Sequence, residues 1–239
     1  MAAQVPRLRP ATVVARPRLL RVLARPWKVA VLSAPAGFGK TTLAAQYAAG
    51  RDTLWCRLGP EDRDPGHLLG DLLLAAARAR RPFGARTRRL FESRRDMERD
   101  GAVLTASFLD ELAPARGRRL VVLDDAHALA EARAGLQWLR RVIEESGPRV
   151  GFLVACRGEC PLPLARLDLH GGSVVLRAPD LQFTDDEQAR LLRDAFHLRA
   201  GSPARAALLG AVGGWPAGVV LAARHLQRDP DPRLPRRAL

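Results

Sequence analysis

Cysteine, tyrosine and lysine are scarce in this sequence, and it has no long apolar run. The three cysteines (Cys56, Cys156 and Cys160) are too few and too unevenly spaced for a disulfide framework or a four-ligand zinc site. Cys56 and Cys156 lie in apolar, strand-like runs, which predicts that both are buried as small hydrophobic residues. No apolar run approaches the roughly 18 to 20 residues of a membrane span, and no apolar signal segment follows the N-terminus. We therefore expect a cytoplasmic protein without a membrane partner.

Arginine carries almost all of the positive charge. The formal net charge is +14, yet Lys28 and Lys40 are the only lysines. An excess of this size favours attraction to polyanions. The arginines are scattered along the chain, and no zinc-finger, RNP or helix-turn-helix pattern accompanies them. We expect DNA to be contacted only indirectly, or non-specifically through this basic surface with an affinity that falls as salt rises.

The order of elements predicts an α/β domain with a smaller helical part. Apolar, strand-like runs alternate with helical patterns, and the predicted strands cover 29–33, 53–57, 119–123, 150–155 and 173–176. The predicted helices cover 17–24, 41–49, 66–80, 97–112 and 131–145, whereas the polar and basic stretch 81–96 is expected to be a mobile surface loop. Strands separated by helices form a parallel sheet with right-handed crossovers, and its ligand lies at the carboxyl ends of the strands.

From Thr184 onward the pattern is wholly helical. Thr184 and Glu187 have the spacing of a capping box, which predicts a helix that runs to about residue 196. Two further helices are predicted over 203–212 and 216–226, with a glycine-rich turn between them. The expected organisation is an N-terminal arm (1–28), an α/β domain (29–180), a small all-helical lid domain (181–227) and a tail or linker start (228–239).

The stretch APAGFGKTT at 34–42 directly follows the first predicted strand and has the form of a phosphate-binding P-loop. Its small residues let backbone N–H groups point at phosphate oxygens, and the helix that begins near Lys40 adds the positive end of its dipole. Lys40 would reach the β- and γ-phosphates, and the Thr41 hydroxyl would ligate a magnesium ion. The residues expected to hold the nucleotide here are Ala36, Gly37, Phe38, Gly39, Lys40, Thr41 and Thr42.

Two carboxylates, Asp124 and Asp125, follow an apolar run in the form of a Walker B element. We assign Asp124 to the magnesium ion and Asp125 to polarising the attacking water. Arg157 follows the next predicted strand, where an arginine could contact the γ-phosphate and stabilise the charge on its departure. Because parallel strands end at one edge of a sheet, we expect these residues to converge with Lys40 into a catalytic set of Lys40, Asp125 and Arg157.

Sequence blocks beyond the P-loop resemble the STAND-class ATPases, and in particular the ATPase module of MalT-type and large LuxR-family transcriptional regulators. The blocks are RPRLL at 16–20, APAGFGKTTL at 34–43, LVVLDDAH at 120–127, CRGECPLPLARL at 156–167, LQFTDDE at 181–187 and GGWPAG at 213–218. The likeness as a whole extends from about residue 14 to 226. The resemblance therefore concerns nearly the whole chain, which makes it far more specific than the P-loop alone.

The resemblance implies a P-loop NTPase fold of the AAA or NB-ARC kind, followed by a helical lid. It implies that Arg157 senses the γ-phosphate, that Pro216 of the Gly-x-Pro element packs near the adenine, and that Arg16 lines the base and ribose side. The implied ligands are ATP or ADP with Mg²⁺, with slow hydrolysis as a switch and with protein partners or self-association on ATP binding. Full-length relatives add a sensor and a DNA-binding domain, so we expect a switch module present without them.

Two other functions are compatible with a P-loop. A phosphotransferase would need an acceptor pocket and an arginine cluster, and the arginines between positions 78 and 95 could supply the cluster, but nothing marks a pocket. An Orc-like DNA-binding AAA ATPase is favoured by charge alone. The signalling ATPase is the leading hypothesis, because the blocks at 181–187 and 213–218 have no reason to occur in a generic nucleotide kinase.

Overall fold

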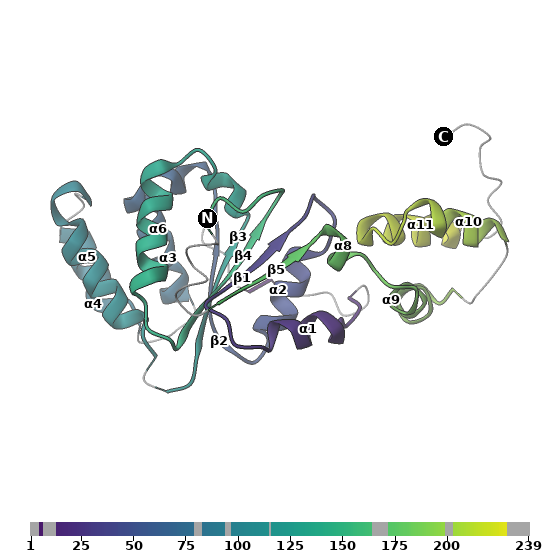
Figure 1. The fold of residues 1–239 in the computed structure, drawn as a ribbon, viewed down its shortest axis with the longest axis horizontal. Coiled ribbons are helices and arrows are strands. Elements are labelled where there is room, and N and C mark those ends of the chain that lie inside the picture. Colours follow the sequence, from purple (N-terminus) through teal and green to yellow (C-terminus); the bar gives the residue numbers. More distant parts are fainter. Residues whose placement is uncertain are drawn as a thin grey trace.

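Five parallel strands form the central sheet of the computed structural model, in the order β2-β3-β4-β1-β5 (Figure 1). The structure describes residues 5–6, 13–78, 83–93, 97–114, 116–163, 172–198 and 203–228. The strands are β1 (Val29–Ser33), β2 (Asp52–Arg57), β3 (Arg119–Asp124), β4 (Val150–Cys156) and β5 (Ser173–Arg177). The apolar runs predict all five to within one residue at each end, and the predicted parallel sheet is confirmed.

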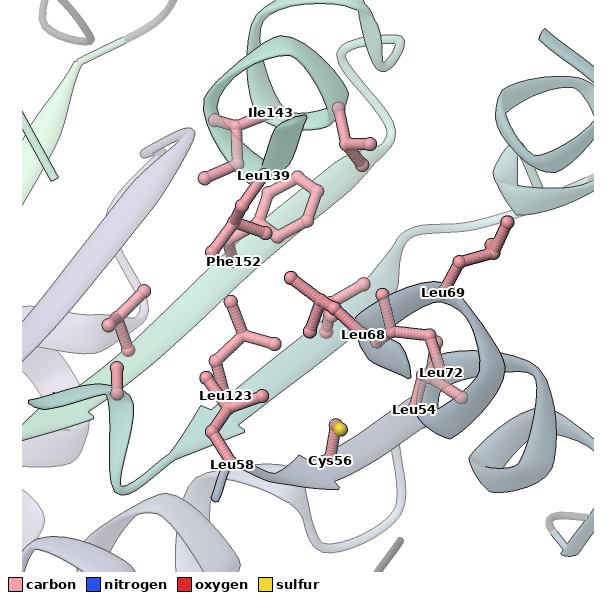
Figure 2. Packing of buried hydrophobic residues seen from close by; sticks show 14 of the residues in the cluster. Leu54, Cys56, Leu58, Leu68, Leu69, Leu72, Leu123, Leu139, Ile143 and Phe152 are labelled. Atoms are coloured by element: carbon pink, nitrogen blue, oxygen red, sulfur yellow. The ribbon is translucent and has the colours of Figure 1, made fainter. Parts of the chain in front are cut away.

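Alternate strand residues point to opposite faces of the sheet, and each face carries its own apolar core. On one face, Cys56, Leu123 and Phe152 pack with residues of α3 (Pro65–Arg78) and α6 (Arg133–Glu145), as Figure 2 shows. On the other face, Val122 and Leu153 pack with residues of α1 (Pro17–Leu23) and α2 (Lys40–Ala48). Removing apolar surface from water, at roughly 25 cal/mol for each Å², is the main force that holds these helices on the sheet. This packing fixes the carboxyl ends of the strands in space.

One predicted loop is wrong, because most of it is a helix. Within 81–96, α4 (Ala85–Ser93) lies beside α5 (Met97–Leu112). The Glu111 carboxylate of α5 caps the start of α4, since it accepts hydrogen bonds from the backbone N–H groups of Arg86 at 3.1 Å and Thr87 at 2.8 Å. A carboxylate at a helix N-terminus stabilises the helix. The cap comes from 24 residues further along the chain, so a local pattern does not reveal it.

The C-terminal helical region comprises α9 (Asp185–Arg190), a π-helical turn (Leu191–Ala195), α10 (Pro203–Ala211) and α11 (Pro216–Arg228). It follows the short helix α8 (Ala178–Leu181) and lies to the side of the sheet (Figure 1). The predicted capping box is confirmed: Thr184 Oγ1 accepts a hydrogen bond from Glu187 N at 3.3 Å, and Glu187 Oε2 accepts one from Thr184 N at 3.2 Å. The region therefore begins at the residue that the pattern indicates.

Two short 3-10 helices, η2 (Pro60–Arg63) and η3 (Ala126–Leu129), follow β2 and β3 at the carboxyl edge of the sheet. Of the expected tail at 228–239, residues 229–239 lie outside the described part of the chain, as does most of the expected arm before residue 13. Among the described residues, no helix combines the length and the apolarity that crossing a membrane requires.

Candidate functional site

The P-loop connects β1 to α2, whose first residue is Lys40. Gly37 and Gly39 have φ angles of +81° and +76°, which residues with a side chain rarely adopt, so the loop conformation depends on glycine at both positions. The Lys40 Nζ donates hydrogen bonds to the carbonyl oxygens of Ala34 at 2.6 Å and Pro35 at 2.7 Å. Burial lowers the pKa of the Lys40 ammonium. Within the described part of the chain, the hydrogen-bonded partners of this buried cation are neutral carbonyls, and this arrangement favours an anion in front of the loop.

Thr41 and Asp124, the two residues expected to ligate magnesium, lie side by side although they are 83 residues apart in sequence. The Thr41 hydroxyl lies 3.1 Å from each carboxylate oxygen of Asp124 and donates its hydrogen bond to them. Asp124 is 5% exposed, and burial, with repulsion from Asp125, raises its pKa. A hydroxyl and a carboxylate are hard oxygen donors of the kind that Mg²⁺ prefers, so the residues present fit this ion.

Asp125 lies among cationic groups at the same edge of the sheet. Its φ angle of +59° is left-handed, which aspartate tolerates better than most residues. Its Oδ2 lies 2.9 Å from both Nε and Nη2 of Arg57. Its Oδ1 lies 3.8 Å from Nε of Arg157 and 3.8 Å from Nδ1 of His127. Arg57 ends β2 and Arg157 follows β4, the two strands that flank β3, so three neighbouring strand ends meet at this carboxylate.

The strand ends and the P-loop border an open cavity of about 280 Å³, here called the phosphate cavity. Its walls are formed by Ala36, Gly37, Gly39, Lys40, Thr41, Arg57, Asp125 and Arg157. The three residues assigned to catalysis from sequence, Lys40, Asp125 and Arg157, therefore line one space. Arg57 is an additional member that no motif singled out. The sequence feature that could have identified Arg57 is its position at the end of a predicted strand, which is also the basis on which Arg157 was selected.

Two of the residues expected to hold the nucleotide do not line the phosphate cavity. Phe38 is half-buried and packs against the apolar cluster on the α2 side of the sheet. Thr42 is half-buried in the first turn of α2. The assignment of these two residues to the nucleotide stays a prediction.

Residues around Trp215 bring the C-terminal helical region onto the P-loop. Trp215 Nε1 donates a hydrogen bond to the Ala36 carbonyl at 3.2 Å, and Ala217 N donates one to the Gly37 carbonyl at 3.0 Å. A Cβ added at Gly37 would lie 2.7 Å from atoms of both Trp215 and Ala217. Pro216, between them, is buried as the first residue of α11. The predicted Gly-x-Pro element is thus seated on the P-loop, and its contact with adenine stays a prediction.

The Arg16 side chain points into the start of the helical region, and its assignment to the base and ribose side of the nucleotide stays a prediction. Its guanidinium donates hydrogen bonds to the carbonyls of Leu181 at 2.9 Å and Gln182 at 2.7 Å and to the Glu187 carboxylate at 3.0 Å. Arg18 of α1 lies 3.1 Å from the other Glu187 oxygen. Burial acts to raise the pKa of Glu187, but hydrogen bonds from Arg18 and Arg16 outweigh it and leave this pKa lowered. The Arg16 side chain therefore fastens the arm to the helical region.

A second cavity, of about 290 Å³, lies between the arm and the helical region and is called here the arm cavity. Residues 13–15, directly before Arg16, form one wall, and residues of α9 and the π-helical turn, including Arg190 and Asp194, form another. Gln46 of α2 donates a hydrogen bond to the Val14 carbonyl at 2.7 Å and so connects this wall to the helix that follows the P-loop.

Curated proteins include distant relatives that match nearly the whole chain. The chain is 29% identical over 229 residues to the serine/threonine-protein kinase PknK of Mycobacterium tuberculosis. The aligned stretch covers 92% of this chain and 20% of PknK. The chain is 27% identical over 219 residues to the HTH-type transcriptional regulator MalT of Vibrio cholerae, which covers 90% of this chain and 24% of MalT. The chain thus spans between a fifth and a quarter of these relatives. No protein-family model matches it.

Solved structures share the fold. The Walker-type ATPase PABY2304 of Pyrococcus abyssi matches with a TM-score of 0.56 and 16% identity, over 95% of this chain and 73% of that one. The STAND protein PH0952 of Pyrococcus horikoshii, which has a tetratricopeptide repeat sensor, matches with a TM-score of 0.55 and 20% identity, over 88% of this chain and 29% of that one. The chain is therefore a distant homologue of MalT and PknK, with the fold of Walker-type and STAND ATPases.

Proposed function

We propose that this chain is an ATP-binding signal-transduction ATPase, the ATP/ADP-controlled switch module of a MalT- or LuxR-like transcriptional regulator. The observation that carries the proposal is the meeting of Lys40, Thr41, Asp125 and Arg157 around one cavity on which the helical region rests. The distant homology to MalT supports the regulatory setting. On ATP binding, the module would bind a protein partner or self-associate. It would contact DNA only indirectly or through the basic surface.

The phosphate chain of the nucleotide would occupy the phosphate cavity. Lys40 would leave the carbonyls of the P-loop for the β- and γ-phosphates, because hydrogen bonds between charged groups are about twice as strong as those between neutral ones. Arg157 is exposed and lies 3.8 Å from Asp125, so it is free to turn toward a γ-phosphate. Since only a triphosphate offers that partner, Arg157 would distinguish ATP from ADP.

Magnesium suits the oxygen donors of Thr41 and Asp124. These two residues would hold the ion, which when bound neutralises charge on the phosphates. Burial and the neighbouring Asp125 raise the pKa of Asp124, so its negative charge is unfavourable in the unliganded chain. A bound cation would compensate this charge. Asp125 would orient and polarise the attacking water after Arg157 has turned away from it. Slow hydrolysis is the reaction expected of this arrangement.

The helical region, residues 181–227, would act as a lid on the α/β domain of residues 29–180. A triphosphate would compete with Trp215 and Ala217 for the space over the P-loop, so ATP and ADP would favour different positions of the lid. The arm cavity offers a place for the adenine between residues 13–15 of the arm and the lid. The tail at 228–239 would begin a linker to the rest of a regulator.

The test is the nucleotide-dependent thermal stability of Lys40→Ala, with Arg141→Ala on the exposed face of α6 as a matched control. Ligand at about 100 times Kd stabilises a protein by about 2.7 kcal/mol. We expect ATP with magnesium to produce this shift in the wild-type chain and in the control, and no shift in Lys40→Ala, because the point charge on the phosphates is lost. A full shift in Lys40→Ala would place the nucleotide elsewhere.

A further inference from the structure

Arg57 lines the phosphate cavity, and the proposed function gives it no role. Its guanidinium contacts Asp125, the carboxylate assigned to the attacking water. We propose that Arg57 is a positioning residue, which holds Asp125 by one carboxylate oxygen so that the other oxygen faces the attacking water. This role rests on the proposed function, because it concerns the hydrolysis of ATP in the same cavity.

Two guanidinium nitrogens of Arg57 contact one oxygen of the Asp125 carboxylate. The Nε atom donates a hydrogen bond to Oδ2 at 2.9 Å, and Nη2 lies 2.9 Å from the same oxygen. Hydrogen bonds between ionised groups are about twice as strong as those between neutral groups. The contact therefore fixes the direction of the carboxylate, although the Arg57 side chain itself is exposed.

The other oxygen, Oδ1, has no such short contact within the described residues. Its two charged or titratable neighbours are Nε of Arg157 and Nδ1 of His127, each 3.8 Å away, which is too long for a hydrogen bond. The His127 Nδ1 atom is buried, and the described part of the chain gives it no hydrogen-bond partner. Oδ1 is therefore the oxygen that can accept a hydrogen bond from water once Arg157 turns toward a γ-phosphate.

The sheet holds Arg57 more firmly than Arg157. Arg57 is the last residue of β2 and lies opposite Asp124 in the parallel register of β2 and β3. The N–H group of the next residue, Leu58, donates a hydrogen bond to the Asp124 carbonyl at 2.8 Å, so the ladder continues past Arg57. Arg157 instead comes after the last residue of β4. Side chains on strands are positioned more precisely than those on loops, so Arg57 suits a fixed role and Arg157 a moving one.

The reaction needs one correctly directed carboxylate oxygen. The water oxygen attacks the γ-phosphorus, the bond from this phosphorus to the β-phosphate oxygen breaks, and ADP leaves with the electron pair of that bond. Oδ1 of Asp125 accepts the hydrogen bond of the water, and the water proton passes through it to the released phosphate. Arg57 acts only on the direction of the carboxylate, as the third group that orients a base.

Steady-state hydrolysis of radiolabelled ATP by the full chain gives the first test. Arg57→Ala should lower kcat by about 10- to 100-fold, because a displacement of about 1 Å at a reacting group can cost about 100-fold. KM and the ATP-dependent thermal shift should stay within about twofold of the wild-type values, since Lys40 and Arg157 are still in place. Arg57→Lys should keep part of the activity at most, because an ammonium is a point charge without the planar fork of a guanidinium.

The matched control is Arg63→Ala, which removes an exposed arginine from η2. Arg63 contacts the Ala128 carbonyl and Glu131 and does not contact Asp125, so this variant should keep the wild-type kcat. Guanidinium chloride at millimolar concentration, far below the molar range that unfolds proteins, should restore part of the kcat of Arg57→Ala alone. A purely structural loss would not be restored in this way.

Asp125→Asn decides whether Arg57 acts through Asp125. Two residues that act as a unit are not additive, so Arg57→Ala should lower the kcat of Asp125→Asn by less than about twofold. A further loss as large as that in the wild-type background would overturn the positioning role and assign Arg57 to the phosphates. An unchanged or increased kcat in Arg57→Ala would also overturn it.

Nucleotide binding separates this proposal from the proposed function. If ATP raises the thermal stability of the wild-type chain and is hydrolysed equally well by Arg57→Ala, the positioning role is wrong and the proposed function stands. If ATP binds to the wild-type chain without being hydrolysed, the positioning role is wrong while nucleotide binding stands. If ATP produces no thermal shift in the wild-type chain, the proposed function is wrong and the positioning role fails with it.

Discussion

Asp124 and Glu187 are both buried carboxylates, at 5% and 1% exposure, and their surroundings are opposite. Asp124 ends β3 beside the Thr41 hydroxyl and the carboxylate of Asp125, and its pKa is raised chiefly by burial. Glu187 lies at the start of the helical region under two arginine side chains, whose hydrogen bonds leave its pKa lowered. The fold therefore disfavours charge on Asp124 and favours charge on Glu187.

This difference distinguishes a ligand site from a structural contact. The contact of Glu187 with Arg16 and Arg18 is here called the joint. A buried carboxylate with a raised pKa beside a cavity is typical of functional sites, where a bound cation supplies the missing compensation. A buried carboxylate already paired with arginines has its compensation within the chain, and removing one partner is costly. The uncompensated charge of Asp124 beside the phosphate cavity is thus expected to lower the free energy of unfolding until a cation binds. The joint between the arm and the helical region is expected to raise it.

The largest expected effect comes from breaking the joint with Glu187→Gln. The substitution keeps the size of the side chain but leaves the Arg16 guanidinium buried without its anion, at a cost of about 3 kcal/mol in free energy of unfolding. Urea denaturation measures this cost. The control is Asp186→Asn, an exposed acid on the same helix, which should change stability by less than about 0.5 kcal/mol. Equal losses in the two variants would show that the pair is not a joint.

The next prediction is a difference between two substitutions where the helical region meets the P-loop. Gly37→Ala and Gly39→Ala both place a side chain at a positive φ angle, which costs about 1–2 kcal/mol in each. Only at Gly37 would the new Cβ also meet Trp215 and Ala217, whereas nothing lies within 4 Å of it at Gly39. Overpacking adds about 1–3 kcal/mol, so Gly37→Ala should be the less stable of the two without nucleotide. Hydrogen exchange in α11 should rise in that variant alone, and matched exchange in both would contradict the contact.

Asp124→Asn should change the free energy of unfolding in the direction opposite to Glu187→Gln. The amide still accepts the hydrogen bonds of Thr41 and of the Asp125 N–H, but it carries no buried charge, so the free energy of unfolding should increase by about 1 kcal/mol. The same variant should lose the part of ATP-dependent stabilisation that requires magnesium. Both effects are read from thermal unfolding with and without the metal. Destabilisation as large as that of Glu187→Gln would place Asp124 among the structural groups instead.

The smallest expected effect is a difference in acid sensitivity. Because the pKa of Glu187 is lower in the folded chain than its ordinary 4.5, its contribution to stability is complete above that value and is lost as the pH falls through the folded-state pKa. Asp124, with a raised pKa, acts in the reverse direction, since protonation in the folded state removes its cost. Between about pH 6 and pH 3, Glu187→Gln should lose less stability than the wild-type chain. Parallel acid profiles of the two proteins, followed by circular dichroism, would rule out this linkage.

Local patterns were sufficient for the sheet and for the P-loop. Each strand is a short run of apolar residues whose alternate side chains face two cores, and such a run can be recognised in the sequence. The P-loop follows because Gly37 and Gly39 must take positive φ angles between a strand and a helix. The capping box at Thr184 was visible for the same reason, since both of its hydrogen bonds lie within one turn.

Contacts between distant segments were not visible in this way. Helix α4 depends on a cap supplied by Glu111 of another helix, so its basic sequence was mistaken for a loop. Arg57 belongs to the phosphate cavity because β2 lies beside β3 in the sheet, and no motif contains it. The contact of the Arg16 guanidinium with Glu187, which is 171 residues away, is not contained in any local pattern either.

The strands, the P-loop and the strand ends that carry Asp124, Asp125 and Arg157 could all be read from the sequence, because they depend on local periodicity and backbone geometry. The contacts that these strand ends and the P-loop make became visible only in the folded chain: Arg57 lies against Asp125, Trp215 lies on the P-loop, and Arg16 lies under Glu187. Hydrogen bonds and ion pairs act over a few ångströms in space, so they depend on which residues the folded chain brings together and not on their separation in sequence.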